Sequence, residues 1–341
     1  MKKLSFLGKL IYGLNTVVAF LLLVSFVLPY LPPKTFPTLA LLSLGVSPLL
    51  LINMVFALYW LIRLKKQFLI SFVVLLIAYF HFNPFFEFSS EGDASKYKNT
   101  LSILSYNVRL FNAYEKNTSE EAVTLEFAKL LKKESPDIVC IQEFYADYTT
   151  DMSNYPYQFI HFKEPGNRLG HAIFSKYPLI NKGGFDFKNS YNNTIFADVV
   201  VNSDTIRVYN LHLQSLGILP SVGFLQKEGT EYIKKRIAET FVEQEVQIGE
   251  ILEHKAKTQY PVIVAGDFNN TSFSYAYKEL KRNMKDAFLE RGNGIGTTYS
   301  FVSYPMRIDY ILTSETFDVL RFDNIKQTFS DHYPVSATLG W

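Results

Sequence analysis

Three long apolar stretches constrain the first quarter of this chain more strongly than any other feature. They cover residues 10–31, 39–62 and 68–82, and no Asp or Glu occurs before Glu87. A helix needs about 20 consecutive apolar residues to cross about 30 Å of hydrocarbon. The first two stretches have that length, and the third is somewhat shorter. A core helix of a water-soluble protein has a polar face, and these stretches show none.

The cations predict how these helices are oriented. Lysines precede the first stretch, Arg63 and two lysines lie between the second and the third, and only Lys34 lies in the opposite loop. Cytoplasmic loops carry the excess of Lys and Arg. We therefore expect residues 1–86 to form three transmembrane helices in a bacterial inner membrane, with a cytoplasmic N-terminus and an extracytoplasmic remainder. An even number of spans would instead place the remainder of the chain in the cytoplasm.

A cleaved signal peptide is the alternative interpretation of the first stretch. Its apolar run is too long, and the bulky pair Pro29-Tyr30 stands where a small-residue cleavage site would be needed. We therefore expect a retained helix.

The rest of the chain differs sharply in composition. Residues 87–98 are polar and lack periodicity, which predicts a linker, and residues 99–341 are expected to form one domain. From Glu87 onward the chain holds 27 Lys and Arg against all 32 Asp and Glu, a formal charge of −5. A protein that holds a long duplex electrostatically usually has a basic surplus. The charge therefore argues against bulk DNA as the partner.

Within this domain, strand patterns outnumber helical ones. Helical spacing covers residues 119–135, after a capping Ser119, and the region from about Glu228 to Lys257. Strand-like runs occupy residues 101–109, 137–143, 172–178, 196–201, 206–213, 262–270, 307–312 and 333–339. Many strands with few helices predict sheets packed together with helices outside, rather than a strict βαβ repeat.

Polar side chains follow five of these runs at the point where each run ends. They are Asn107, Glu143, the pair Asn210 and His212, the pair Asp267 and Asn269, and the pair Asp331 and His332. Such groups cost free energy to bury without partners. One ending of this kind is most often a turn or a cap, but five in one domain predict that the side chains meet.

These residue types suit metal-assisted hydrolysis of a phosphate ester. Hard oxygen ligands such as Glu143 and Asn107 are those that Mg²⁺ prefers. Attack by water also needs a carboxylate to align it, which Asp267 can supply. A histidine with a carboxylate behind it completes the chemistry, and His332 with Asp309 fits that description.

Six segments then show a resemblance to a known family. LSYNVR, DIVCIQE, YNLHLQS, VAGDFN, RIDYIL and SDHYPV resemble, in order, the motifs of the endonuclease/exonuclease/phosphatase superfamily. That superfamily includes deoxyribonuclease-like and abasic endonucleases, neutral sphingomyelinases and inositol polyphosphate 5-phosphatases. The resemblance covers about residues 99–341 and implies an α/β fold, a four-layer sandwich of two central mixed sheets flanked by helices. It suggests a membrane-anchored bacterial type of this fold.

The resemblance also implies roles for the metal-binding residues. Asn107 and Glu143 would hold a divalent ion, Mg²⁺ or Mn²⁺, with Glu143 as the main ligand. Asp331 would assist the metal or the neighbouring His332. Arg109, two residues past Asn107, could reach a phosphate, but a solvated arginine is an equally good interpretation. Whether one metal or two is bound stays open.

The remaining positions would carry the chemistry. By resemblance, His212 and Asn210 would contact the scissile phosphate, and Asp267 and Asn269 would orient the water and the transition-state oxygens. Asp309 would orient His332. Whether Asp267 or His332 is the general base stays open at this point.

We therefore expect a membrane-anchored, divalent-metal-dependent phosphoesterase that hydrolyses phosphodiester or phosphomonoester bonds by in-line attack of water. The substrate could be a lipid headgroup, a small phosphoester or nucleic acid, and no protein partner can be inferred. The closest alternative is an extracytoplasmic endonuclease or exonuclease acting on DNA or RNA. A catalytically inactive, membrane-tethered binding module is the alternative from another class, although every expected catalytic position is filled.

Overall fold

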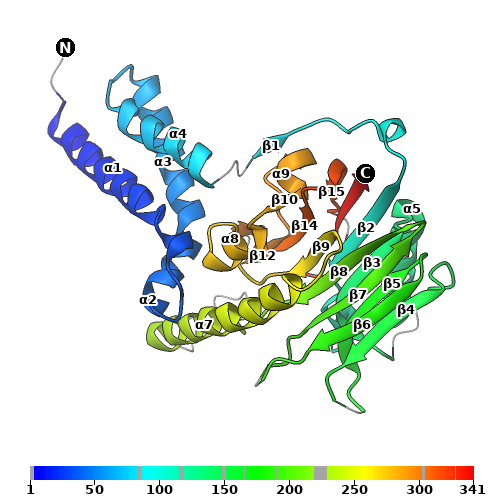
Figure 1. Cartoon of the computed structure of the whole chain (residues 1–341). Helices are drawn as coiled ribbons and strands as arrows, with labels where there is room; N and C mark the ends of the chain where they lie inside the picture. The colour runs from blue at the N-terminus through cyan, green and yellow to red at the C-terminus, as the bar shows by residue number, and fades with distance from the viewer. Residues whose placement is uncertain are drawn as a thin grey trace.

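The computed structural model describes residues 4–82, 86–114, 119–147, 151–164, 166–188, 190–218, 229–301, 304–326 and 328–341. An N-terminal group of helices lies against an α/β domain (Figure 1). The expected start of the long helix at Glu228 falls outside the described residues.

Two six-stranded mixed sheets form the centre of the domain. The first has the order β15 (Asp318–Asn324), β16 (Val335–Gly340), β2 (Thr100–Asn107), β3 (Ile138–Tyr145), β5 (Leu169–Ser175) and β4 (Tyr157–Phe162). The second has the order β10 (Met284–Asp286), β14 (Asp309–Ser314), β9 (Val262–Asp267), β8 (Asp204–His212), β7 (Thr194–Val201) and β6 (Leu179–Phe185). In each sheet one central pair is parallel, β2 with β3 and β8 with β9, and the other pairs are antiparallel.

Helices cover the outer faces of both sheets. Phe127 of α5 (Glu120–Glu134) packs with Leu104 of the first sheet, and Ile248 of α7 (Thr230–Lys255) packs with Val264 of the second. Smaller helices, α8 (Tyr275–Lys281) and α9 (Ala287–Arg291), follow along the second sheet. Between the sheets lies an apolar core to which both contribute, for example Ile103 and Ile263. The predicted four-layer α/β sandwich is confirmed.

The sequence signals that predicted α5 act as expected. The Ser119 hydroxyl accepts a hydrogen bond from the Ala122 N–H at 3.4 Å, and two glutamates occupy the first turn. Lysines occupy the last turn, where they interact favourably with the helix dipole. Ser135 adopts a left-handed conformation and ends the helix before Pro136. These signals set where α5 begins and ends, and its apolar side chains then pack on the first sheet.

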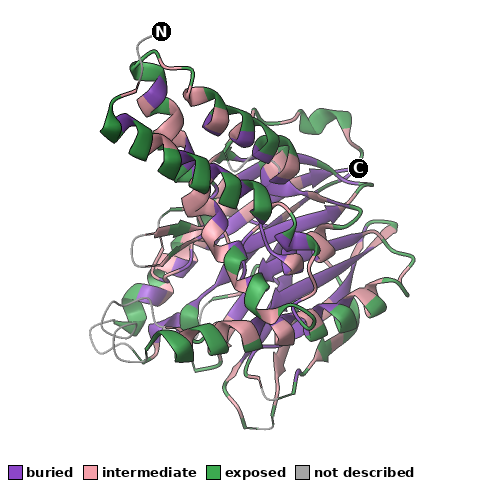
Figure 2. Cartoon of the chain, turned by 90° about the vertical axis from the view of Figure 1, so that its left-hand side faces the viewer, coloured by how far each residue is buried: buried purple, intermediate pink, exposed green. Residues whose placement is uncertain are grey.

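The N-terminal region consists almost entirely of helix. It contains α1 (Phe6–Ser25), the 3₁₀ turn η1 (Leu28–Tyr30), α2 (Pro37–Ala40), η2 (Leu41–Gly45), α3 (Val46–Ile62) and α4 (Phe68–Phe82). The segments Phe6–Tyr30 and Pro37–Ile62 are long and apolar enough to cross a membrane, and the apolar α4 is shorter, with 15 residues. Exposed positions alternate with partly buried ones along these helices (Figure 2), and many of the exposed ones are large and apolar.

The few polar side chains inside this helix group bind one another. Asn15 Nδ2 donates to Ser71 Oγ at 2.5 Å, and Ser71 Oγ donates to Asn53 Oδ1 at 3.0 Å. Trp60 Nε1 donates to Asn15 Oδ1 at 3.0 Å, and all four side chains have 0% exposure. Such bonds stabilise contacts between helices in an apolar environment. The network therefore joins α1, α3 and α4 into one unit.

Residues 87–98, expected to be a linker, are bound along the domain. β1 (Glu87–Phe88) pairs with β11 (Asn293–Gly294), and the Gly92 N–H donates to Leu320 O at 2.7 Å. The Tyr97 hydroxyl donates to Asp318 at 2.9 Å. The sequence of this segment lacks periodicity because hydrogen bonds to β11 and to the edge strand β15 hold it, rather than an apolar face. It is a strap on the domain, not a free tether.

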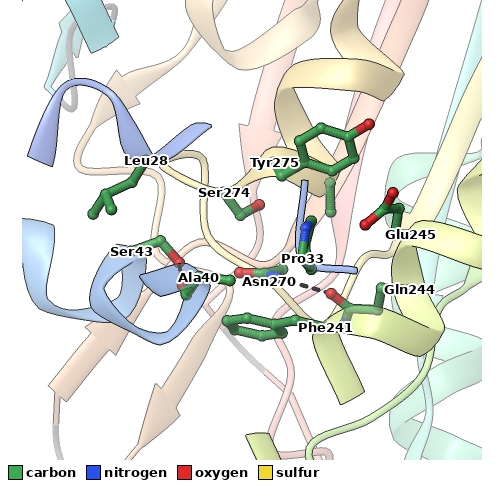
Figure 3. A pocket seen from close by; sticks show the side chains of 11 residues that line it. Leu28, Pro33, Ala40, Ser43, Phe241, Gln244, Glu245, Asn270, Ser274 and Tyr275 are labelled. Carbon is green, nitrogen blue, oxygen red and sulfur yellow. Dashed lines mark hydrogen bonds between the residues drawn. The ribbon is translucent and has the colours of Figure 1, made fainter. Parts of the chain in front are cut away.

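The helix group also rests directly on the domain. Figure 3 shows Pro33, Ala40 and Ser43 facing Phe241 and Gln244 of α7 across a cavity of about 10 Å³. That volume corresponds to about one water molecule. Nearby, the Lys34 N–H donates to Glu245 at 2.6 Å. The contact is therefore closely packed.

One buried amide joins the two sheets. Asn210 of β8 donates from Nδ2 to Ile141 O at 2.9 Å and to Ala172 O at 3.0 Å, and its Oδ1 accepts from Gln142 Nε2 at 2.6 Å. Those partners belong to β3 and β5, whose register shifts after Ile141. At this irregularity, the carbonyl groups of Ile141 and Ala172 accept hydrogen bonds from Asn210, which belongs to the opposite sheet. We name this set of contacts the Asn210 clamp.

Replacing Asn210 by Ala should destabilise the protein by about 2–4 kcal/mol, because two buried carbonyls and one amide donor lose their partner. A domain of this size should then melt roughly 5–10 °C lower. Thermal unfolding of the full chain in detergent would measure it. The control Asn167→Ala removes only a turn contact to the Leu169 N–H. Equal shifts in both variants would contradict the clamp's role.

Candidate active site

The polar strand ends predicted from the sequence do meet at one edge of the two sheets. Asn107 is paired with Gln142 across the parallel strands β2 and β3, and His212 is paired with Asp267 across β8 and β9. Asp309, the first residue of β14, lies opposite Asp267 in the antiparallel pair. Parallel neighbours bring their carboxyl ends to the same edge of a sheet. The pairing itself therefore gathers these side chains.

The backbone of β9 approaches β8 very closely at this edge. Gly266 has φ +141°, and a Cβ at this position would lie 2.0 Å from Leu211 O. Only glycine fits such an approach without displacing the neighbouring strand. Gly266 therefore allows Asp267 to lie beside His212.

Glu143 and Asn107 form the first corner of the site. Glu143 has φ +52° and follows the register shift between β3 and β5, a distortion that re-aims a side chain. Asn107 Nδ2 donates to Glu143 Oε1 at 3.2 Å and to Asp267 Oδ2 at 3.0 Å. Burial raises the pKa of Glu143, and the nearby Asp331 carboxylate adds to that rise. A cation beside Glu143 would offset both effects.

His332 and Asp309 form the second corner. The imidazole Nδ1 lies 3.0 Å and 3.2 Å from the two oxygens of Asp309, and its Nε2 lies 3.7 Å from Asp267 Oδ2. Burial alone lowers the pKa of His332, but the carboxylates of Asp309 and then Asp267 more than compensate and raise it to about 10. Asp309 therefore keeps Nδ1 protonated and leaves Nε2 to face Asp267.

Asp267 lies between the two corners. Its Oδ1 accepts from the Asn269 N–H at 2.8 Å, and Asn269 has φ +49°. Burial raises the pKa of Asp267 to about 6, although His332 opposes this rise. A carboxylate with such a pKa is suited to accept a proton near neutral pH.

His212 completes the group from the second sheet. Its Nε2 lies 3.7 Å from both Glu143 Oε1 and Asp267 Oδ2, and 2.8 Å from the amide nitrogen of Asn192. Burial lowers the pKa of His212 to about 4, so the imidazole is neutral. Asn192 could not be predicted as a site residue, because it lies in a loop between strands rather than at a strand end.

Other predicted residues are placed less directly. Arg109 Nε lies 3.6 Å from Asp331 Oδ2, and both side chains line the cleft. Asn269 lines it as well, with its Nδ2 donating to Leu213 O at 2.9 Å. Asn210 does not, because the Asn210 clamp uses both of its amide protons and leaves 0% of the residue exposed. The expected phosphate contact of Asn210 is therefore not possible in this structure, and Asn210 is a positioning residue.

Two sets of residues are candidates for holding a divalent ion. Ligand atoms of Asp267, Asp309 and His332 all lie within 4.8 Å of one another, so this group can hold a metal by geometry. However, the hydrogen bond of His332 to Asp309 already uses the proton-bearing nitrogen. Glu143 with Asn107, assisted by Asp331, offers hard oxygen donors, and burial raises the pKa of the Glu143 carboxylate although His332 and Arg109 oppose this rise. The second set fits Mg²⁺ chemistry better.

A partly apolar cleft of about 320 Å³ opens above these residues. One wall comes from the hairpin of β12 (Tyr299–Phe301) and β13 (Tyr304–Met306), which places Tyr299, Phe301 and Met306 there, and Ile308 follows. The Tyr299 ring lies against His332 with ring centroids 4.9 Å apart. Among the described lining residues, Arg109 is the single Lys or Arg. The sequence did not predict this wall, because its strands have three residues each.

The sequence of residues 104–332 matches the Endonuclease/Exonuclease/phosphatase family. The chain belongs to this family. Members of the superfamily hydrolyse phosphoester bonds. Residues 8–85 match a separate domain of unknown function (DUF8431). The search of curated proteins gave no match.

Solved structures of the same family show the same fold. A mannosyl-6-phosphatase from Bacteroides thetaiotaomicron has a TM-score of 0.55 and 20% identity, with 71% of this chain and 100% of that chain covered. Another family protein from that organism gives 0.55 and 19%, covering 71% and 97%. A humanized D. rerio TDP2 gives 0.52 and 16%, covering 71% and 99%. At these identities the likeness concerns the fold alone.

Replacing Asp309 by Asn should lower the pKa of His332 clearly from about 10, because the effect of burial is then opposed only by the carboxylates of Asp267 and Asp331. His332 with its raised pKa stabilises the fold fully below its unfolded pKa, and this contribution disappears as pH rises through about 10. In the variant, the stability of the fold should therefore depend much less on pH in the alkaline range. Histidine NMR of the metal-free full chain would measure the pKa. Asp93→Asn, in an exposed turn, is the control, and an unchanged His332 in Asp309→Asn would contradict the pairing.

Proposed function

We propose that this protein is a membrane-anchored, divalent-metal-dependent phosphoesterase that cleaves a phosphate ester by in-line attack of water. The observation that carries this proposal is the meeting of Glu143, Asp267 and Asp309 with His212 and His332, from both sheets, beside one cleft that Glu143, Asp267 and His332 line. Membership in a family of phosphoester hydrolases agrees with it.

Glu143 would hold the metal as its main ligand, with the Asn107 amide oxygen and Asp331 beside it. When bound, the ion supplies Lewis-acid polarisation of the phosphoryl oxygen and stabilises the leaving oxygen. Asn107 Nδ2 bridges Glu143 and Asp267, so it fixes the distance between the metal-binding carboxylate and the carboxylate that faces the water.

Asp267 is the general base in this proposal. Its pKa near 6 leaves it ionised at neutral pH, and the Asn269 N–H holds one of its oxygens in place. His332, which Asp309 keeps protonated, binds a phosphate oxygen through Nε2 and stabilises negative charge there. The sequence left open whether Asp267 or His332 is the general base. We propose Asp267 because it is ionised at neutral pH, whereas His332 is protonated.

His212 contacts the phosphate as a neutral group. Its pKa of about 4 removes any charge at neutral pH, so it contributes orientation rather than electrostatic attraction. Asn269 lies at the cleft and orients transition-state oxygens. Arg109, paired with Asp331, adds the remaining positive charge of the cleft.

The cleft supports an amphiphilic phosphate ester as substrate. Tyr299, Phe301 and Met306 place an apolar wall beside the proposed phosphate site. A nucleic acid would need several cations along its backbone, and the described lining supplies Arg109 as its single Lys or Arg, with His332 at the catalytic corner. The name of one solved relative, mannosyl-6-phosphatase, indicates that this fold can act on a sugar phosphate. A lipid headgroup is therefore the leading class, and a nuclease is the alternative.

The anchor in this proposal is the N-terminal helix group. The long apolar helices Phe6–Tyr30 and Pro37–Ile62 cross the membrane, and α4 crosses with them because the buried network through Ser71 binds it to both. This gives three spans, a cytoplasmic N-terminus and an extracytoplasmic catalytic domain. Large apolar side chains exposed on these helices, such as Leu51 and Val55, support contact with lipid.

Replacing Glu143 by Gln should lower kcat/KM at least about 100-fold and raise the Mg²⁺ concentration needed for half-maximal activity, because the main ligand loses its charge. Hydrolysis of bis(4-nitrophenyl) phosphate by the full chain, titrated with Mg²⁺ after chelation, would measure both. Glu121→Gln, on the first turn of α5, is the matched control. Full activity in a chelator would contradict the metal.

A series of 4-nitrophenyl phosphodiesters with alkyl groups from methyl to hexyl tests the substrate class. The value of kcat/KM should rise by roughly tenfold or more along the series, because each buried CH₂ contributes up to about 0.8 kcal/mol. Phe301→Ala should flatten the rise, whereas Phe88→Ala, at a side chain 91% exposed, should not. A flat series together with salt-sensitive DNA hydrolysis would favour the nuclease instead.

A further inference from the structure

A second cavity, of about 290 Å³, lies where the ends of α1 and α4 meet α8. None of its described lining residues also lines the active-site cleft. The helix group contributes aromatic and imidazole rings to it, and the catalytic domain contributes hydroxyls and cations. Its described lining consists of Pro29, Tyr30, His81, Phe82, Ser272, Tyr277, Lys278, Lys281 and Arg282.

The charge of this cavity is positive. Lys278, Lys281 and Arg282 line it, and no Asp or Glu occurs among its described lining residues. The nearest paired acid, Glu279, lies 2.7 Å from Lys278 and 3.8 Å from Arg282, so one carboxylate is shared by two cations. The Lys278 ammonium also lies 4.6 Å from the centre of the Tyr30 ring, which keeps it beside the helix group. An anion of about the size of a phosphate would offset the excess charge.

An apolar groove runs along the same two helices. It has a volume of about 490 Å³, and its described lining is Thr16, Ala19, Phe20, Leu23, Leu69, Ile70, Val73, Val74 and Ile77. Ile77 precedes His81 by four residues, so the two lie on the same face of α4, about 6 Å apart along the axis. On α1, Leu23 similarly precedes the turn that bears Pro29 and Tyr30. The groove therefore leads along α1 and α4 toward the cationic cavity.

We propose that one anionic phospholipid binds here, with its phosphate in the cationic cavity and an acyl chain in the groove. The proposal rests on the membrane anchoring proposed above, and it is independent of the catalytic assignment. Tyr30 and His81 lie at the ends of apolar helices, the level at which headgroups and interfacial aromatic rings meet. Basic side chains near that level attract anionic headgroups. The occupant thus matches the charge of the cavity and the apolar lining of the groove.

This lipid would bridge the two parts of the protein. Its headgroup contacts α8 of the catalytic domain, and its chain contacts α1 and α4. Phe82 and Phe273 already join the two parts beside the cavity, with ring centroids 5.1 Å apart. The lipid would therefore reinforce an existing contact rather than create a new one.

The test uses the full chain reconstituted in nanodiscs of phosphatidylcholine with increasing phosphatidylglycerol, followed by native mass spectrometry of retained lipid. The double variant Lys281→Gln/Arg282→Gln should weaken phosphatidylglycerol retention by on the order of tenfold, since two cations near the surface are removed. The charge-conserving variant Lys281→Arg/Arg282→Lys should retain it. The matched control Lys234→Gln/Lys235→Gln, on the exposed face of α7, should bind as the unchanged protein does.

Hydrolysis of soluble bis(4-nitrophenyl) phosphate should be the same in all these proteins, so loss of lipid is separated from failure of the catalytic proposal. Three results would overturn the lipid site: no preference for phosphatidylglycerol in the unchanged protein, equal loss in the α7 control, or displacement by inorganic phosphate, which would indicate a soluble anion. A chain that does not enter the nanodisc would overturn the anchoring and the lipid site together.

Discussion

The distance between the two sheets controls the chemistry of this site. Glu143 belongs to the first sheet and Asp267 to the second, so neither strand pairing fixes their separation. Apolar packing between sheets is non-directional and allows small sliding movements. The Asn210 clamp adds direction, since its amide can satisfy Ile141 O, Ala172 O and Gln142 only in one register. Asn107 repeats this link at the floor of the cleft, where it binds both carboxylates.

That fixed separation brings carboxylates together at a free-energy cost. Burial raises the pKa of both Glu143 and Asp267, which means that their ionised forms are poorly solvated there. His332 compensates Asp309 and part of Asp267, but it is hydrogen-bonded away from the Glu143 corner. At the Glu143 corner, His332 and Arg109 oppose the rise in the pKa of Glu143 but do not cancel it, so its negative charge is compensated only in part. A site that keeps such charge in a buried position is prepared for a cation, as functional sites with shifted pKa values often are.

The sequence predicted the parts of this fold that have a periodic or terminal signal. Strands ending in Asn107, Glu143 and Asp267 could be found because an apolar run stops at a polar residue, and α5 could be found from its cap and stripe. The two-sheet architecture and the meeting of the strand ends followed from these signals and from the family resemblance.

Features without a local signal could not be predicted. The apolar wall comes from strands of three residues, too short to show alternation, and residues 87–98 bind an edge strand through backbone groups that no side chain reveals. Asn210 was found, but its role was not. A strand-end asparagine looks the same in sequence whether its amide faces a substrate or the opposite sheet, and only the register shift between β3 and β5 decides between them.

The contacts between the helix group and the domain explain why one apolar helix would be insufficient. A single tether would leave the cleft free to rotate relative to the membrane. Here Ser47, at the start of α3, lies close enough to the Tyr304 hydroxyl to oppose the rise in its pKa that burial causes, so the hairpin that forms the apolar wall lies beside the helix group. Lys34 binds α7 at Glu245, and Phe82 packs on Phe273 just before α8. These three contacts do not lie on one element, so together they oppose rotation about any axis. The wall that would receive the apolar part of a substrate is thus held by the same helices that we propose to lie in the lipid.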